Sequence, residues 1–543
     1  MKRTALAVWL YGRESAGVRR AAETFLRACA RSGVYGLELC SSDSGGGRVL
    51  SRLGAGTGAG DAEALPADPD VVVALDGETF WGAPDESAFA SAPGRAVIYD
   101  SDGEESAPGV GARALGLPFA RLAPRRALRG HVAAGALVRI AGIEPRDCAA
   151  VDGPEAAAAF SAGHDYAAAN FPDLGFALPA SDRRLAALRG SDALGAGALV
   201  AGCRFHSFPA AGRVLGERVA DGAMIRAEGG DALSAALMAV GAGFAGARAM
   251  AELPPGEAAL ASQAAAWAAG AEVPAVFVAS DAAGTEAFAG VVMGPTSVED
   301  AYASVAEAFD LAETFHTPVT LLAEPGLLGS GETVPLPPVA GPPRRGLWAV
   351  PRADRADAHH PRYGADAGGV SPRAVPGHAG LLHAACPPER ERGEARARRI
   401  EKLRRKRASI LEALRPEIVE GPERAQVTII ARGAACAALR PAALRFNAGR
   451  EGGAGVNLLP VRYLSPFPGA RVARLLEDSK RAAIAVTDPG DPLVRLVRQE
   501  AGVAGARMVV LRDPADPGRL LADIRELLEE PAEGNSETLH SDG

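Results

Sequence analysis

The chain has 543 residues, 48% of them hydrophobic and 23% charged, and is too long for a single hydrophobic core, so we expect three domains. A formal net charge of −8 gives no basic field, so neither nucleic acid nor an anionic membrane surface is expected as a partner. Gln263 and Glu272 interrupt the longest alanine-rich stretches before they could span a bilayer, so we expect no transmembrane helix.

The six cysteines lie far apart and form no C-x-x-C pair, so the chain itself is not expected to hold zinc or an iron–sulfur cluster. Such usage is typical of a protein of the reducing cytoplasm, and we expect a cytoplasmic location. Near the start, Arg13 and Glu14 end the apolar run "TALAVWLYG", and no A-x-A cleavage site follows. The run is therefore interpreted as a first strand rather than a signal peptide.

Residues 1–150 alternate between strand and helix patterns. "ALAVWL", "DVVVALDG" and "AVIYDSD" are typical of buried strands, and "ESAGVRRAAETFLRACARSG" of an amphipathic helix that ends before Gly33. This order predicts a mainly parallel sheet covered on both faces. The turn "YGRESAGV" has only Gly12 and Gly17 of a G-x-G-x-x-G motif, and Glu14 would repel a phosphate, so an ordinary strand-to-helix turn is favoured over a phosphate cradle.

After Pro145 the periodicity weakens, and residues 151–189 are predicted to be a linker. A second α/β unit is expected over 190–333, with helices at 231–245 and 297–313 and strands in "EVPAVFVAS" and "TPVTLLAE".

Residues 334–424 are predicted to form an extended arm followed by a charged helix. Ile400, Leu403, Ile410 and Leu414 form its apolar seam, and packing by this stripe is favoured over a nucleic-acid role. A third α/β unit is expected over 425–530, and the polar tail 531–543 is predicted to be disordered.

Residues 224–250, "MIRAEGGDALSAALMAVGAGFAGARAM", combine a short apolar run with a long helix of small residues. One face of this helix almost lacks side-chain bulk, because small residues recur at three- and four-residue spacing: Ala232, Ala235, Ala239, Gly243 and Gly246. Such a face costs stability in water, so we expect backbones to meet there, as at a subunit interface.

Glu228 lies between this strand and this helix. In the simpler interpretation it favours the positive end of the helix dipole beside Asp231, the expected N-cap. In the alternative it is a ligand-binding group, because α/β sheets place such groups where strands end.

The same region carries a resemblance to a known family. "AGCRFHSFPAAGRVLGERV" followed by "MIRAEGGDALSAALMAVGAGFAGARAM" resembles the pyrimidine-binding domain of the alpha subunit of 2-oxoacid:ferredoxin oxidoreductases, of the 2-oxoglutarate type with a fused gamma domain. "DVVVALDG" and "GLPFARLA" resemble the gamma domain, "GGVSPRAVPG" the family's I-S-P-R-A-I-P-G arm, and "VRYLSPFP" its C-terminal domain. The resemblance implies three α/β domains: gamma-like, thiamine pyrimidine-binding and transketolase C-terminal-like.

In such an enzyme, thiamine diphosphate is shared between the alpha and beta subunits. The resemblance places the magnesium ion and the [4Fe-4S] cluster on the beta subunit and no metal on this chain. The other implied partners are ferredoxin, the 2-oxoacid and coenzyme A. Glu228 of "RAEGG" matches the family glutamate that shares a proton with the aminopyrimidine ring and promotes deprotonation of the thiazolium carbon; oxidative decarboxylation to an acyl-CoA then sends electrons to ferredoxin.

The substrate-binding segment departs from the family pattern. The family loop Y-P-I-T-P-S is here "FPAAGR", which begins at Phe208 and Pro209 and has Ala211 in place of the threonine that contacts the substrate carboxylate. Loss of that hydrogen bond costs about 1–3 kcal/mol if its partner stays buried. Arg213 either compensates by pairing with the carboxylate or is a solvent-exposed arginine.

Three further segments also differ: "ELPPG" at 252–256 replaces T-S-G-P-G, "DAAGTEAFAG" replaces a longer loop, and "VTDPGDP" replaces V-E-Q-N-x-x-G-Q.

Two functions remain open, an active alpha subunit and a catalytically impaired paralogue that acts as a structural or regulatory subunit. A transketolase-type enzyme is disfavoured because it has no gamma-like domain. Among the histidines, His206 alone is near enough to serve as an acid–base group, and a packed histidine is the favoured interpretation.

Overall fold

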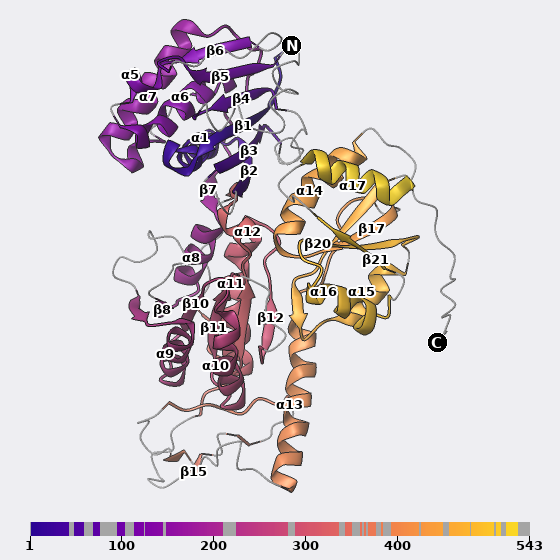
Figure 1. Cartoon of the computed structure of the whole chain (residues 1–543). Helices are drawn as coiled ribbons and strands as arrows, with labels where there is room; N and C mark the ends of the chain where they lie inside the picture. Colours follow the sequence, from indigo (N-terminus) through magenta and orange to yellow (C-terminus); the bar gives the residue numbers. More distant parts are fainter. Residues whose placement is uncertain are drawn as a thin grey trace, which may run out of the picture.

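The computed structural model shows three α/β units, each built on its own sheet (Figure 1). It describes residues 2–42, 48–58, 69–76, 95–103, 113–123, 125–144, 148–209, 224–280, 288–335, 343–349, 359–360, 363–364, 368–375, 382–383, 393–422, 425–448, 455–477, 479–503, 506–511 and 517–529. The polar tail 531–543 lies outside these residues. The predicted fold class, α/β with three units, is confirmed.

The first unit contains an eight-stranded sheet in the order β6-β5-β4-β1-β3-β2-β14-β7. Its strands are β1 (Ala5–Arg13), β2 (Tyr35–Ser42), β3 (Arg48–Gly56), β4 (Val71–Ala74), β5 (Ala96–Asp100), β6 (Arg113–Leu117), β7 (Leu185–Arg189) and β14 (Gly331–Pro335). The strands from β6 to β1 are parallel, as predicted, whereas β3, β2, β14 and β7 add antiparallel pairs. The expectation of a mainly parallel sheet thus holds for only half of it, because β2 and β3 form a meander beside β1.

The turn after β1 is a site of close helix packing. Gly17 precedes α1 (Val18–Arg31) with φ +88°, and a Cβ atom there would lie 3.1 Å from the backbone nitrogen of Gly130. Gly130 belongs to α6 (Arg129–Ala141), and its own Cβ would meet the carbonyl oxygen of Gly17 at 2.3 Å. The glycines therefore allow two helices to approach, which supports the ordinary turn over the phosphate cradle.

The prediction of a linker at 151–189 is wrong in its first half and at its end, where Leu185–Arg189 form strand β7 of the first sheet. Residues Pro154–Asn170 form helix α7, and Ala159, Phe160 and Ala167 are buried in the core of the first unit. Gly163 sits so close to α6 that a Cβ would meet the carbonyl oxygen of Val132 at 2.1 Å. Alanine and glycine make this buried face so small that it produces little hydrophobic periodicity, which explains the wrong prediction.

The second unit contains a seven-stranded sheet in the order β19-β12-β13-β11-β10-β8-β9. Its strands are β8 (Phe205–Pro209), β9 (Ile225–Gly229), β10 (Ala249–Leu253), β11 (Ala275–Ala279), β12 (Val291–Met293), β13 (Pro318–Leu322) and β19 (Tyr463–Ser465). Its helices are α8 (Gly190–Val200), α9 (Ala232–Phe244), α10 (Ala258–Gly270), α11 (Val298–Phe315) and α12 (Pro325–Gly329). All pairs are parallel except that of β12 with β19, a strand that comes from the C-terminal part of the chain.

The third unit has a four-stranded parallel sheet in the order β18-β17-β20-β21. Its strands are β17 (Ala425–Ala431), β18 (Gly455–Pro460), β20 (Ala482–Val486) and β21 (Arg507–Val510), within the α/β unit predicted over 425–530. The helices of this unit are α14 (Gly433–Asn447), α15 (Gly469–Leu476), α16 (Pro492–Arg495) and α17 (Pro517–Glu529).

The charged helix exists as predicted, as α13 (Glu394–Ala413), but its apolar seam packs only at one end. Ile410 is buried, whereas Ile400 and Leu403 are 44% and 40% exposed. Lys402 and Lys406 are buried instead, and their Nζ atoms donate to the Glu272 carboxylate at 2.6 and 2.7 Å. Glu272 of the second unit thus neutralises two buried lysines. The apolar periodicity of the helix could not predict this contact, because it depends on a residue distant in the sequence.

Candidate functional site

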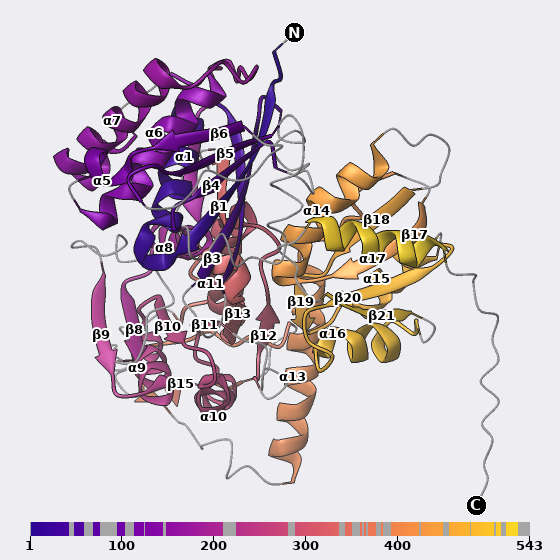
Figure 2. The same cartoon turned by 45° about the horizontal axis from the view of Figure 1, so that its top comes forward.

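The candidate site lies at the carboxyl ends of three parallel strands, β8, β9 and β10, at one edge of the second sheet (Figure 2). Glu228 of the outermost strand β9 is paired with Phe208, and Gly229 with Pro209. Because the ends of parallel strands meet at one edge of a sheet, residues from three separate segments converge here. The sequence anticipated this position for Glu228.

Alternation along the strands determines which face of the sheet each side chain occupies. The Ser207 hydroxyl donates to the carbonyl oxygen of Ala235, so Ser207 faces α9. His206 and Phe208 therefore point to the opposite face, together with Glu228, the lateral partner of Phe208.

Glu228 is exposed and has no part in capping α9. Asp231 is the N-cap, its carboxylate accepting from the backbone N–H of Ser234 at 2.7 Å, a bond that holds the Asp231 pKa below its usual range. Glu257 accepts the N–H of Ala232 at 2.9 Å. The predicted cap at Asp231 is confirmed, and two other carboxylates already serve the helix terminus, so the simpler interpretation does not explain Glu228.

The surroundings of Phe208 include the cation Arg226 and the buried polar pair His206 and Glu252. The Arg226 guanidinium carbon lies 5.2 Å from the centre of the Phe208 ring. His206 and Glu252 are almost completely buried, and His206 Nε2 lies 2.6 Å from Glu252 Oε1. Glu252 belongs to β10 and not to a loop, so the "ELPPG" segment begins inside the sheet.

The structure thus brings together Glu228, Phe208 and Pro209 from the predicted site, and it adds Arg226 and Glu252. Ala211 and Arg213 lie outside the described residues. Alternation in "IRAEG" could have placed Arg226 on the face of Glu228. The partner of Glu252 could not be inferred, because His206 is 46 positions away in the sequence and the contact depends on the strand order.

The small-residue face of α9 packs inside the second unit, so the expectation of a subunit interface there is wrong. Ala232, Ala235, Ala239 and Gly243 are all buried, and a Cβ at Gly243 would meet the carbonyl oxygen of Pro274 at 2.2 Å. The close approach foreseen from the spacing is real, but it is to a segment of the same chain.

The outward faces of α9 and α10 and of strand β9 expose large apolar side chains, which we call the outer apolar face. Its members are 40–68% exposed: Ile225, Leu237, Phe244, Leu260 and Trp267. In these helices the large apolar side chains are exposed and the small ones are buried, whereas an ordinary surface helix buries its large apolar side chains.

Within the described ranges, no group of three or more histidine, cysteine or acidic side chains has an arrangement that could hold a metal ion. In the same ranges, no helix has the length and apolar character needed to cross a membrane.

Comparison with solved structures gives a whole-chain match. The 2-oxoglutarate:ferredoxin oxidoreductase from Magnetococcus marinus, solved with 2-oxoglutarate, coenzyme A and succinyl-CoA bound, matches with a TM-score of 0.82 and 21% identity over 97% of this chain and 100% of its own. A gamma subunit of a keto/oxoacid ferredoxin oxidoreductase from Geobacter sulfurreducens covers 30% of this chain and 99% of its own, with 18% identity and a TM-score of 0.26. No protein-family model and no curated protein sequence matches.

The chain therefore has the fold of a 2-oxoacid oxidoreductase subunit with several α/β domains. More particularly, it shares its fold over nearly its whole length with the 2-oxoglutarate:ferredoxin oxidoreductase chain, which confirms the resemblance in the sequence at the level of the fold.

Proposed function

We propose that this protein is the alpha subunit of a 2-oxoacid:ferredoxin oxidoreductase and that Glu228 is its catalytic and cofactor-binding carboxylate. One observation carries the proposal. Glu228 is the next-to-last residue of the edge strand β9 and its side chain is exposed, while Asp231 and Glu257 already satisfy the neighbouring helix terminus. An acid in this place has a function other than supporting the local fold.

The residues present suit one end of thiamine diphosphate. A carboxylate can share a proton with a ring nitrogen, and the buried aromatic residue Phe208 lies beside Glu228 in the sheet. When bound, the cofactor supplies a nucleophilic thiazolium carbon for addition to a 2-oxoacid carbonyl. Glu228 would hold the proton at its carboxylate, and a partner subunit closing over it would exclude water from the shared proton.

The outer apolar face supports the need for such a partner. Apolar side chains as exposed as Ile225 and Trp267 are typical of contact surfaces when they gather on adjoining elements, as they do on β9, α9 and α10. We assign this face to the beta subunit, on which we also place the magnesium ion and the [4Fe-4S] cluster. Ferredoxin, the 2-oxoacid and coenzyme A complete the proposed set of partners, in the cytoplasm.

For substrate binding we propose the segment that starts at Phe208 and Pro209 and continues through Ala211 and Arg213. Arg213 would pair with the substrate carboxylate in place of the hydroxyl that the family threonine provides. Which 2-oxoacid is used follows from this segment and from the beta subunit.

The burial of Glu252 favours a second function, that of a structural or regulatory subunit. Glu252 replaces a small hydroxyl residue of the family motif, and its carboxylate is buried against His206. The Glu252 carboxylate and the His206 ring therefore contact each other and are not available to a ligand. A structural or regulatory subunit without its own catalysis would tolerate such a change.

The test is reconstitution with candidate beta chains, followed by calorimetric titration with thiamine diphosphate. The proposal predicts a complex that binds the cofactor and reduces a dye when a 2-oxoacid is added. A complex that forms but binds no cofactor would favour the structural subunit. Turnover by this chain without a partner would contradict both functions.

A further inference from the structure

A cavity of about 230 Å³ lies where the first unit meets the second, and Glu228 is not among its lining residues. Four elements form its wall: α1, β2, β7 and α8. Its polar lining residues are Glu23, Arg27, Glu38, Arg189 and Asp192. An engineered apolar cavity of about 150 Å³ is large enough to bind benzene, so this one can hold a small organic molecule.

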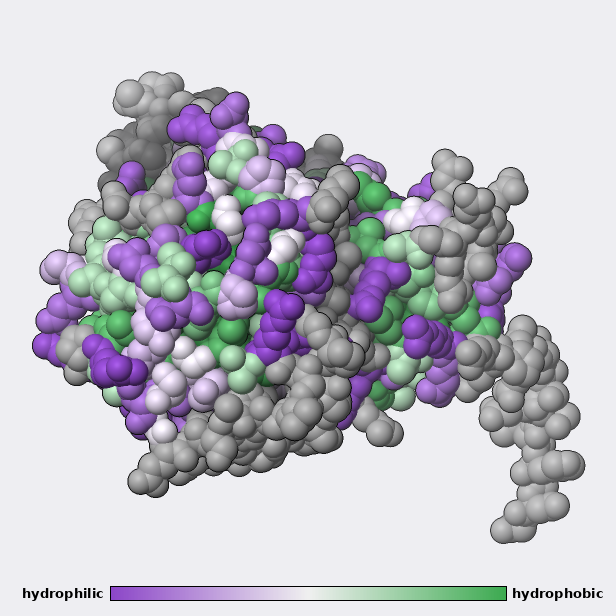
Figure 3. Space-filling model, turned by 90° about the horizontal axis from the view of Figure 1, so that it is seen from above, coloured by the Kyte–Doolittle hydropathy of each residue, from purple (hydrophilic) through white to green (hydrophobic). Residues whose placement is uncertain are grey.

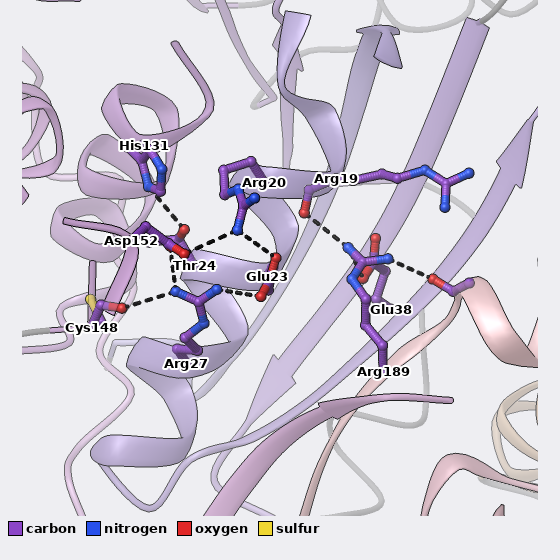
Figure 4. Close-up of polar contacts among 11 residues, drawn as sticks. Arg19, Arg20, Glu23, Thr24, Arg27, Glu38, His131, Cys148, Asp152 and Arg189 are labelled. Carbon is purple, nitrogen blue, oxygen red and sulfur yellow. Dashed lines mark hydrogen bonds and ion pairs between the residues drawn. The ribbon is translucent and has the colours of Figure 1, made fainter. Parts of the chain in front are cut away.

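The Glu38 side chain lines the cavity and is 0% exposed. It lies beside Arg189 (Figure 4). Its Oε1 accepts a hydrogen bond from the Ser51 hydroxyl. Its Oε2 accepts none from the described residues, and the nearest cation, Arg189 Nη2, lies 3.4 Å away. A buried carboxylate oxygen without a hydrogen bond costs free energy, unless something else donates to it.

The two guanidinium groups of the cavity already donate to protein acceptors. Arg189 donates to the carbonyl oxygens of Gly329 and Arg19, at 2.8 and 2.9 Å. Arg27 donates to Glu23 and Asp152 and to the carbonyl oxygen of Cys148 (Figure 4). These bonds occupy part of each guanidinium, whereas Glu38 Oε2 is a buried acceptor without a hydrogen-bond donor among the described residues.

Gly331 packs closely against this carboxylate. A Cβ atom at Gly331 would lie 2.8 Å from Glu38 Oε2 and 2.7 Å from Leu26 Cδ1, so a larger residue there would displace the wall of the cavity. The remaining wall is apolar and consists of Leu26, Ala187, Leu188, Ala196 and Leu199. All the lining residues except Leu26 and Glu38 are partly exposed, so the cavity is open to solvent.

We propose that this cavity is a binding site for a small organic ammonium compound, whose N–H groups donate to Glu38 Oε2 and whose short apolar chain contacts Leu26, Leu188 and Leu199. Three carboxylates and two guanidinium groups line the cavity, so the charge balance also favours a cation. Burial raises the pKa of Glu38 more than the field of Arg189, the Ser51 hydrogen bond and the field of Arg19 lower it.

The test uses the full chain and n-butylammonium as the probe, with n-butyrate as the anionic counterpart of similar size. Calorimetric titration at constant pH and ionic strength should give a dissociation constant on the order of 1 mM for the ammonium ion, the strength expected of a small fragment. Butyrate should bind at least tenfold more weakly. Equal or stronger binding of butyrate would overturn the proposal, because the arginines would then define the site, and so would failure of n-butylammonium to bind.

Two variants locate the binding, with unfolding curves to verify that each is folded. Glu38→Gln removes the charge, and Ala196→Phe fills the cavity from α8 without altering Glu38; each should weaken n-butylammonium binding at least tenfold. The matched control is Glu417→Gln, which changes another buried carboxyl that lies outside the cavity lining and whose pKa burial also raises. Unchanged affinity in both cavity variants, or equal loss in the control, would overturn the proposal.

Discussion

His206 Nε2 and Glu252 Oε1 lie 2.6 Å apart within the second sheet, where both side chains are almost fully buried. The two residues come from β8 and β10, which are hydrogen-bonded neighbours in the sheet. Their contact links a residue next to the proposed site with the segment that departs from the family motif. A buried polar pair of this kind sets the geometry of its surroundings without adding much net stability.

This pair allows a double-mutant test. Glu252→Leu alone should destabilise the chain by about 3 kcal/mol, because it removes the carboxylate that lies beside the buried His206 ring. The double variant His206→Phe/Glu252→Leu should recover a large part of this loss, since apolar residues often replace a buried polar pair without cost. Urea unfolding of the wild type, both single variants and the double variant gives the coupling free energy. Additive effects would show that the two side chains do not interact.

Two glycines of α9 test the inward orientation of its small-residue face. Gly243→Ala should destabilise the chain by about 1–3 kcal/mol, because the new Cβ would lie 2.2 Å from the carbonyl oxygen of Pro274. Gly241→Ala, on the exposed face with nothing within 4 Å of its Cβ, should stabilise by about 1 kcal/mol through helix propensity. Thermal unfolding measures both variants. Equal effects of the two substitutions would show that this face does not pack as described.

The contact between α13 and the second unit should depend on pH. Burial alone would raise the pKa of Glu272, but Lys406 and Lys402 together outweigh burial and hold the pKa below its usual value. The stability that ionised Glu272 contributes is therefore complete above the unfolded-state pKa, near 4.5, and is lost as the pH falls through the lower folded-state pKa.

Glu272→Gln should accordingly cost about 3 kcal/mol at pH 7, since it leaves two buried lysines without a counter-charge. The difference in free energy of unfolding between this variant and the wild type should narrow below pH 4.5. A difference that stays constant from pH 7 to pH 3 would contradict the assignment.

The outer apolar face can be tested apart from catalysis. Trp267→Glu should weaken assembly with the beta chain at least tenfold while the unfolding free energy of the isolated chain changes little, because Trp267 is 50% exposed. Ile418→Glu is the control, since Ile418 is 69% exposed and lies outside this face. Analytical ultracentrifugation of the mixed subunits measures the assembly of both variants. Equal assembly of Trp267→Glu and Ile418→Glu would contradict the assignment of the outer apolar face as the contact surface.

Much of the fold could be predicted, because buried strands and amphipathic helices leave their period in the sequence. The four strands of the third unit and the end of β9 at Glu228 are examples. The prediction failed at α7, where alanine and glycine produce almost no periodicity, and at β14, which crosses from the second part of the chain into the first sheet. Strand order is a long-range property that local pattern does not contain.

The candidate site was predicted in part for a similar reason. Glu228, Phe208 and Pro209 lie together because alternation and strand ends are local features. The small residues of α9 correctly indicated a close approach, but not its partner, which is Pro274 of the same chain. The spacing of small residues predicts a close packing contact, but it does not identify the segment that makes this contact.

The most direct measurement of the central claim is 2-oxoacid-dependent dye reduction by the reconstituted complex carrying Glu228→Gln, beside a complex carrying Glu477→Gln, an exposed carboxylate of the third unit. We predict at least a hundredfold lower turnover for Glu228→Gln with assembly intact, because proton transfer by a positioned group contributes roughly 10²–10⁴-fold, and wild-type turnover for the control. Full turnover by the Glu228→Gln complex would contradict the account.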